Sequence, residues 1–89
     1  MLKQLMLAKK IEQAREILNG YLEEENKFTT RSEELETAID EAKTDEEITT
    51  VEEEVTKLEE DKTELLEKKS KLEGEIAELE GELEELNSK

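Results

Sequence analysis

The strongest constraint on the fold is an apolar heptad series that is mirrored about residue 44. Before this residue the series steps alternately by three and four, through positions 4, 7, 11, 14, 18, 21, 25, 28, 32, 35, 39 and 42. After it, the same stepping gives positions 48, 51, 55, 58, 62, 65, 69, 72, 76, 79, 83 and 86. Each of these seam positions has a partner such that the two residue numbers add to 90, so Leu7 faces Leu83 and Ile39 faces Val51. This symmetry predicts an all-α fold, a long antiparallel two-helix hairpin or coiled coil.

Chance and a single continuous helix are both poorer explanations of this pattern. The seam positions are 24 of the 89 residues and hold 19 of the 29 apolar residues, where random placement gives about eight. Continuing the first series would place Glu46 and Thr49 on the seam, whereas the apolar residues restart at Ile48. At the same place Thr44 and Glu47 form a capping box, in which Thr44 accepts from a first-turn N–H and Glu47 reaches back to the N–H of Thr44. We therefore expect one domain over residues 1–89, with helices over about 2–43 and 45–87 and a turn near Thr44.

Composition excludes several classes of function. The chain has no Cys and no His, so it has neither a thiolate metal site nor the commonest general base at neutral pH. A two-helix hairpin also offers no cleft for a substrate, so we expect no catalytic residue, no metal and no cofactor. The net charge of −15 disfavours nucleic acid and anionic membranes as partners. No stretch is long and apolar enough to be a signal peptide or a membrane span, so a cytoplasmic location is expected.

Two local features leave alternatives open. Residues 26–32 are poor in helix formers and contain a possible second cap from Thr30 to Glu33, but the heptad phase runs through them. One helix that is straight or bent at this point is therefore expected. Gly74 and Gly81 lie one heptad apart on the outward face of the second helix. They either let another helix approach closely or are tolerated surface glycines, and the second explanation is the simpler one.

Five seam positions are polar, and three of them form a layer near the middle of the hairpin. The register places Glu25 opposite Leu65, between Lys62 and Lys69, so its carboxylate can reach either lysine. The lysine stems would cover the neighbouring aromatic rings. Buried polar layers usually set register and partner number at a cost in stability. The polar seam positions are Gln4, Glu25, Ser32, Lys62 and Lys69.

The charges of the two ends favour the antiparallel arrangement independently. Residues 1–15 carry four basic side chains and one acidic side chain, whereas residues 73–86 carry seven Glu and no base. The hairpin register lays these two stretches side by side. Each exposed ion pair contributes only roughly a few tenths of a kcal/mol, so the main effect of these charges is on the relative orientation of the two helices.

The remaining apolar residues gather at the start of the chain. Ten apolar residues lie outside the seam, and five of them fall within residues 1–8. We call Leu2, Leu5 and Met6 the N-terminal patch. It is either a self-association surface or a frayed end in which Leu2 or Met6 folds over Leu86. We favour self-association, because a lone two-helix hairpin buries little area.

The sequence also resembles a known family. The opening MLKQLMLAKKIEQARE, the middle LETAIDEAKTDEEITTVEEEVTKLEED and the Glu/Leu/Lys-rich close are similar to the N-terminal delta, or scaffolding, domain of major capsid proteins of tailed phages, of the Hong Kong 97 type. The resemblance spans the whole chain and is carried mainly by the opening and by the AKTDEE turn. It implies an internal scaffold that contacts neighbouring capsid subunits inside the procapsid, in the host cytoplasm. It also implies removal by a prohead protease, with a processing boundary near residues 87–89.

Two other functional classes compete with this one. A free-standing acidic coiled-coil adaptor or regulator would bind a protein partner through the same surfaces. An acidic mimic of DNA would need charges at phosphate-like spacing on one face, and the heptads already explain the charge pattern here. Shell-forming sequence encoded directly after Lys89 would distinguish the scaffold from the adaptor.

Overall fold

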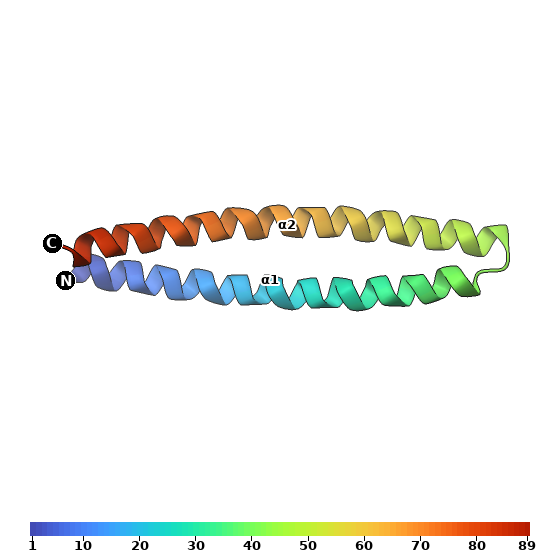
Figure 1. Ribbon diagram of the computed structural model, residues 1–89, viewed down its shortest axis with the longest axis horizontal. Coiled ribbons are helices and arrows are strands. Elements are labelled where there is room, and N and C mark those ends of the chain that lie inside the picture. The colour runs from blue at the N-terminus through green and yellow to red at the C-terminus, as the bar shows by residue number, and fades with distance from the viewer.

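The computed structural model describes residues 1–89 and contains two helices and no strand. Helix α1 spans Leu2–Glu41 and α2 spans Asp45–Asn87. They lie side by side and antiparallel, so both termini are at one end, which we call the open end (Figure 1). The molecule is a rod of 67 × 15 × 15 Å. The predicted all-α antiparallel hairpin is confirmed.

The core is a single line of side chains between the two helices. Every residue that is buried or half-buried lies at a seam position, with the exception of Ala38. Because two helices can cover each other on one face only, most seam residues remain partly exposed and few are fully enclosed. The most deeply buried residues are Leu7, Ile11, Leu35, Leu65 and Ile76.

The link at the tip is longer than the sequence indicates, and its capping differs from the predicted capping box in one detail. Helix α1 ends at Glu41, two residues before the predicted end. Thr44 has the extended backbone of an N-cap, and its Oγ1 accepts a hydrogen bond from Glu47 N at 3.2 Å, as predicted. The Glu47 carboxylate accepts from Lys43 N at 3.0 Å, and not from the N–H of Thr44. The extended conformation of Ala42 carries Lys43 across the end of α2, which places its N–H within reach of that carboxylate.

Close to the tip the predicted seam is wrong by one residue. Ile39 and Ile48 are 54% and 44% exposed, and Ala38 takes the inward position instead of Ile39. Ala38 and Ala42 stand four residues apart, on one face of α1. Their small side chains allow the helix ends to converge on the three-residue link, and this rotation turns Ile39 outward.

Helix α1 continues through the weak stretch of residues 26–32. The hydroxyls of Thr29 and Thr30 donate to the backbone carbonyls of Glu25 and Asn26, each at 3.2 Å. Side chains that bond to the preceding turn in this way are compatible with a helix, and the possible second cap at Thr30 is not formed.

The open end is closed by a polar contact in the predicted register. Gln4 Nε2 donates to the backbone carbonyl of Leu86 at 3.5 Å, and these residue numbers also add to 90. That carbonyl belongs to the last turn of α2, where helical partners are missing. The contact therefore links the first turn of α1 to the last turn of α2, next to the N-terminal patch.

Candidate functional site

The N-terminal patch lies on the outward face of α1. Gln4 and Leu7 face α2, so Leu2, Leu5 and Met6, which fall between and before them, lie off the seam, with Met6 at the edge of a shallow groove that Leu86 of α2 also lines. Their exposed fractions are 77%, 66% and 62%. The alternative in which Leu2 or Met6 folds over Leu86 is therefore not what the structure shows, because the helix begins at Leu2 and both side chains stay open to solvent.

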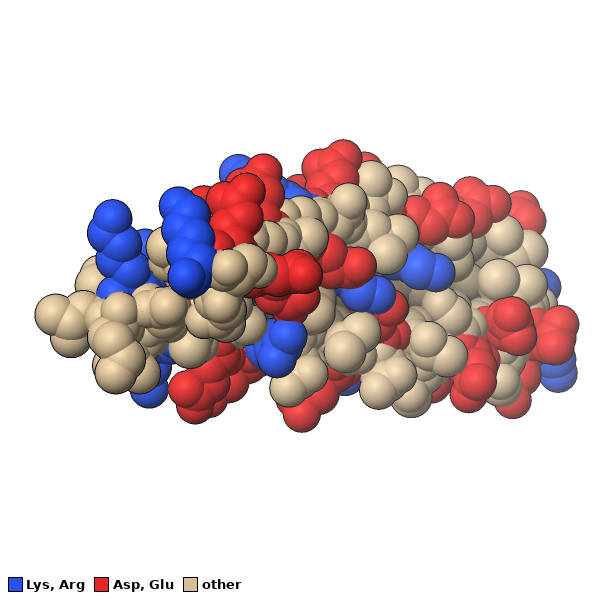
Figure 2. Space-filling view, turned by 60° about the vertical axis from the view of Figure 1, so that its left-hand side comes forward, with Lys and Arg blue, Asp and Glu red and all other residues tan.

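The surroundings of the patch are positively charged. Lys3 and Lys10 form no ion pair within 4.0 Å, and Lys9 has only a loose contact of 3.8 Å with Glu12. The first turn of α1 holds no acidic residue and no capping side chain, so the positive end of its dipole is uncompensated. Figure 2 brings the open end forward and shows an uncharged tip with basic side chains directly behind it.

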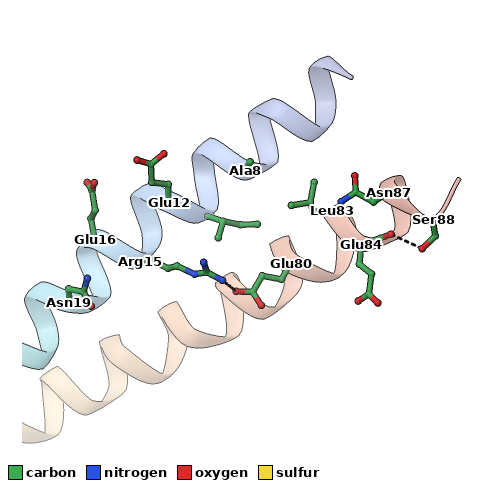
Figure 3. A pocket seen from close by; sticks show the side chains of 11 residues that line it. Ala8, Glu12, Arg15, Glu16, Asn19, Glu80, Leu83, Glu84, Asn87 and Ser88 are labelled. Atoms are coloured by element: carbon green, nitrogen blue, oxygen red, sulfur yellow. Dashed lines mark hydrogen bonds and ion pairs between the residues drawn. The ribbon is translucent and has the colours of Figure 1, made fainter.

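The adjacent end of α2 carries the opposite charge. Its last turn contains no basic residue, so the seven glutamates of residues 73–86 add to the negative end of the helix dipole. Only Glu80 among them is paired, with Arg15 Nη2 at 2.5 Å. Figure 3 shows this bridge beneath a shallow groove between the helices, lined by Ala8 and Leu83 among others. The predicted side-by-side placement of the basic and acidic stretches is thus observed.

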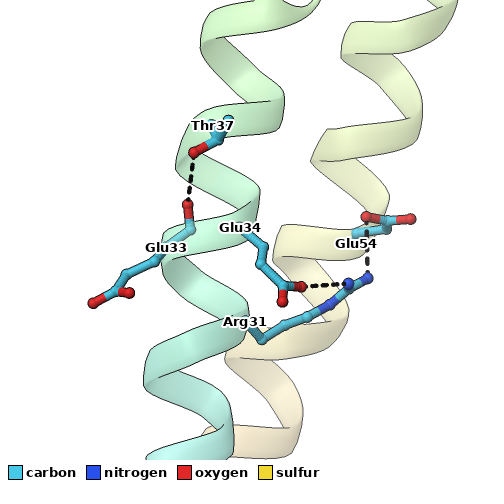
Figure 4. Close-up of polar contacts among 5 residues, drawn as sticks. All are labelled: Arg31, Glu33, Glu34, Thr37 and Glu54. Carbon is cyan, nitrogen blue, oxygen red and sulfur yellow. Dashed lines mark hydrogen bonds and ion pairs between the residues drawn. The ribbon is translucent and has the colours of Figure 1, made fainter.

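A second bridge joins the helices nearer the tip. Arg31 Nη2 contacts Glu54 Oε2 across the helices at 3.3 Å, and its Nη1 contacts Glu34 Oε2 of its own helix at 3.4 Å (Figure 4). Both partners are about half exposed, so each contact contributes little to stability, about 0–1 kcal/mol. The two bridges flank the seam on opposite sides of the rod, as heptad geometry requires for positions beside the core.

The predicted polar layer forms in part: of the two lysines predicted to reach Glu25, only Lys69 does so. Lys69 Nζ lies 2.7 Å from Glu25 Oε1, an oxygen that is sealed from solvent and receives no hydrogen bond from any other group. Hydrogen bonding to Glu25, helped by the negative charges of Glu25 and Glu73, raises the pKa of Lys69 above its ordinary value of 10.5, and desolvation opposes this only in part. Lys62 is exposed and makes no ion pair, so it does not belong to the layer.

The sequence pattern did not identify three further exposed apolar residues as a group. Ile17, Leu22 and Leu66 lie beside seam positions and are 41–52% exposed. Each of the three could have been found in the sequence as an apolar residue directly next to a seam residue. Such residues widen the apolar stripe of each helix. They extend the apolar surface along the sides of the rod and provide matched controls for the N-terminal patch.

Comparisons with known proteins add no identification. No protein-family model, curated protein or solved structure matches the chain. Neither helix contains a stretch of sufficient length and hydropathy to cross a membrane.

Proposed function

We propose that this chain is a non-enzymatic assembly module that brings copies of a larger protein together. The observation that carries the proposal is the N-terminal patch, which exposes three large apolar side chains on a fully formed helix. Contiguous apolar surface of this kind usually marks a protein interaction site. The seam already uses the other face of α1, so the patch is free to contact another molecule.

The specific role we propose is that of the cleavable internal scaffold of a phage major capsid protein. The resemblance of the sequence to that family supports it, and so does the shape of a 67 Å rod with both ends of the chain together. The partners are then other copies and neighbouring capsid subunits inside the procapsid, followed by a prohead protease. Many domains of net charge −15 within one shell would repel incoming DNA, which is a physical reason for removing them before packaging.

Scaffolding requires contacts that form reversibly. Burying one exposed Leu or Met side chain contributes about 1.5–3 kcal/mol before the cost of association, so a single patch gives only weak binding. Many copies held near one another gain affinity by multivalency, without stronger individual contacts. Weak patches on a fully helical hairpin suit this requirement.

The first test is the self-association of the chain. We expect sedimentation velocity to show mass increasing with concentration for the unmodified chain, and monomers for the triple variant Leu2→Ser, Leu5→Ser and Met6→Ser. Circular dichroism should show the same helix content for both, because none of these side chains lies in the seam. An unmodified chain that stays monomeric up to millimolar concentration would contradict the proposal.

A matched control separates the patch from apolar surface in general. The control variant carries Ile17→Ser, Leu22→Ser and Leu66→Ser, three exposed apolar positions away from the open end. We expect it to associate as the unmodified chain does. If both variants lose association equally, the patch has no special part in it.

The second test concerns the capsid role. If the encoding gene continues into a shell-forming sequence, the subunit is expressed with and without residues 1–89 and with the patch variant. Electron microscopy should show uniform procapsids only when the hairpin and its patch are intact. Normal procapsids from the subunit lacking residues 1–89 would contradict the scaffold role and favour the adaptor.

A further inference from the structure

The two helices carry opposite charges at the open end, basic on α1 and acidic on α2. We propose that the N-terminal patch of one chain docks on the outward face of α2 between Gly74 and Gly81 in a second copy of this chain. The inference rests on the proposed self-association and adds which two surfaces meet.

The shape of the α2 face fits a helix. Gly74 and Gly81 lie on the side opposite the seam, with Ala77 and Glu78 between them, so Glu78 is the one long side chain on this strip. A Cβ added at either glycine would meet no atom within 4 Å. The strip covers seven helical steps, about 10 Å, and the patch covers four steps from Leu2 to Met6, about 6 Å, so the patch fits within the length of the strip. Large side chains of the patch can therefore lie against Gly74, Ala77 and Gly81, beside the carboxylate side chain of Glu78.

The charges favour docking of the patch on the α2 face over docking on the N-terminal patch of another chain. Lys3 and Lys10 have no ion-pair partner in their own chain, and Glu80 is the one glutamate of residues 73–86 that has such a partner. Two patches facing each other would bring together six lysines and the positive ends of two helices, with no acidic residue among residues 1–11. A patch on the α2 face instead places the lysines among unpaired glutamates and the positive end of α1 near the negative end of α2.

This arrangement has a consequence for stoichiometry. The patch and the α2 face lie on opposite sides of the rod, because each is on the side of its helix that faces away from the other helix. A chain that docks by its patch therefore leaves its own α2 face open for the next copy. Such a heterologous contact forms rings or open rows, whereas a patch-to-patch contact would stop at a dimer.

The test is a complementation between two defective variants. The patch variant carries Leu2→Ser, Leu5→Ser and Met6→Ser, and the face variant carries Gly74→Gln and Gly81→Gln. The face variant should keep the hairpin fold, since both sites are open in the isolated chain and Gln is a better helix former than Gly. Gly20→Gln, at a third open glycine, is the matched control and should associate as the unmodified chain does.

We expect each variant alone to associate at least tenfold more weakly than the unmodified chain, and a mixture of the two to form a one-to-one complex in sedimentation velocity. The affinity of this complex should fall at higher salt. A face variant that associates normally, or a mixture that forms no complex, overturns the inference while leaving self-association in place. An unmodified chain that stays monomeric but pellets with phosphatidylglycerol vesicles, in a patch-dependent way, overturns both proposals and assigns the patch to a membrane.

Discussion

The position of the core can be tested with two neighbouring leucines. Leu65 is 4% exposed and Leu66 is 46% exposed, although they are adjacent in α2. The substitutions Leu65→Ala and Leu66→Ala remove the same atoms and change helix propensity by the same small amount. Any difference in stability between them therefore measures the packing of the seam.

The structure sets the expected size of this difference. Removing a buried Leu side chain costs about 2–5 kcal/mol, with the larger values where a cavity cannot collapse. The rod is 15 Å thick and its core is one side chain wide, so neighbouring side chains and water can fill the gap. We therefore expect a loss of about 2–3 kcal/mol for Leu65→Ala. Leu66 loses only part of its contacts, and about 0.5–1 kcal/mol is expected for Leu66→Ala.

The assay is urea unfolding followed by circular dichroism, at one fixed chain concentration. A domain of this size has an m-value of roughly 1–1.5 kcal/mol per M, so the midpoint should fall by about 2 M for Leu65→Ala and by less than 1 M for Leu66→Ala. Equal losses, or a larger loss for Leu66→Ala at low concentration, would show that the inward face of α2 is not the one described.

Three further predictions concern the register, the polar layer and the turn. Ile11→Cys together with Leu79→Cys should form a disulfide within one chain under dilute conditions, and cross-linking only between chains in non-reducing electrophoresis would exclude the hairpin. Because the pKa of Lys69 is raised in the folded state, the stability from its ion pair is present below about pH 10.5 and is lost as the pH rises through the folded value. Lys69→Arg should therefore reduce the alkaline loss of melting temperature, whereas Lys62→Arg should not, and equal effects would argue against the pair. Thr44→Ala should cost about 1 kcal/mol in urea unfolding and Thr44→Gly only a few tenths, while no difference between them would show that the cap bond contributes nothing.

Much of the fold was predictable because the heptad pattern encodes it twice, once in each helix. The mirror about Thr44 determined the number of helices, their direction and the pairing of Gln4 with Leu86. The cap bond from Glu47 N to Thr44 was predictable for the same reason, since it depends on residues close in sequence. The exposure of the N-terminal patch also follows from the period alone.

The sequence-based predictions are wrong at two kinds of position: next to the link, where the helix ends converge, and at seam positions that are open to solvent. The pattern could not indicate that Ala38 would replace Ile39, because that choice depends on how closely the helix ends must converge. It also allowed Glu25 to reach either Lys62 or Lys69, and a long flexible ammonium side chain at a half-open seam can equally well remain in water. The heptad pattern of one chain also does not indicate what the N-terminal patch binds.

The placement of both termini at one end of the rod has a mechanical consequence. A force applied between them separates the helices like a zipper, so it acts on one pair of facing residues at a time. Sequential opening of this kind needs much less force than sliding two helices past each other, where all contacts must break together. The first contact to open is the Gln4–Leu86 hydrogen bond, and the Glu25–Lys69 pair lies further along, where a pause in opening is expected. Traction at the two termini therefore opens the 67 Å hairpin from its open end toward the tip, one facing pair after another.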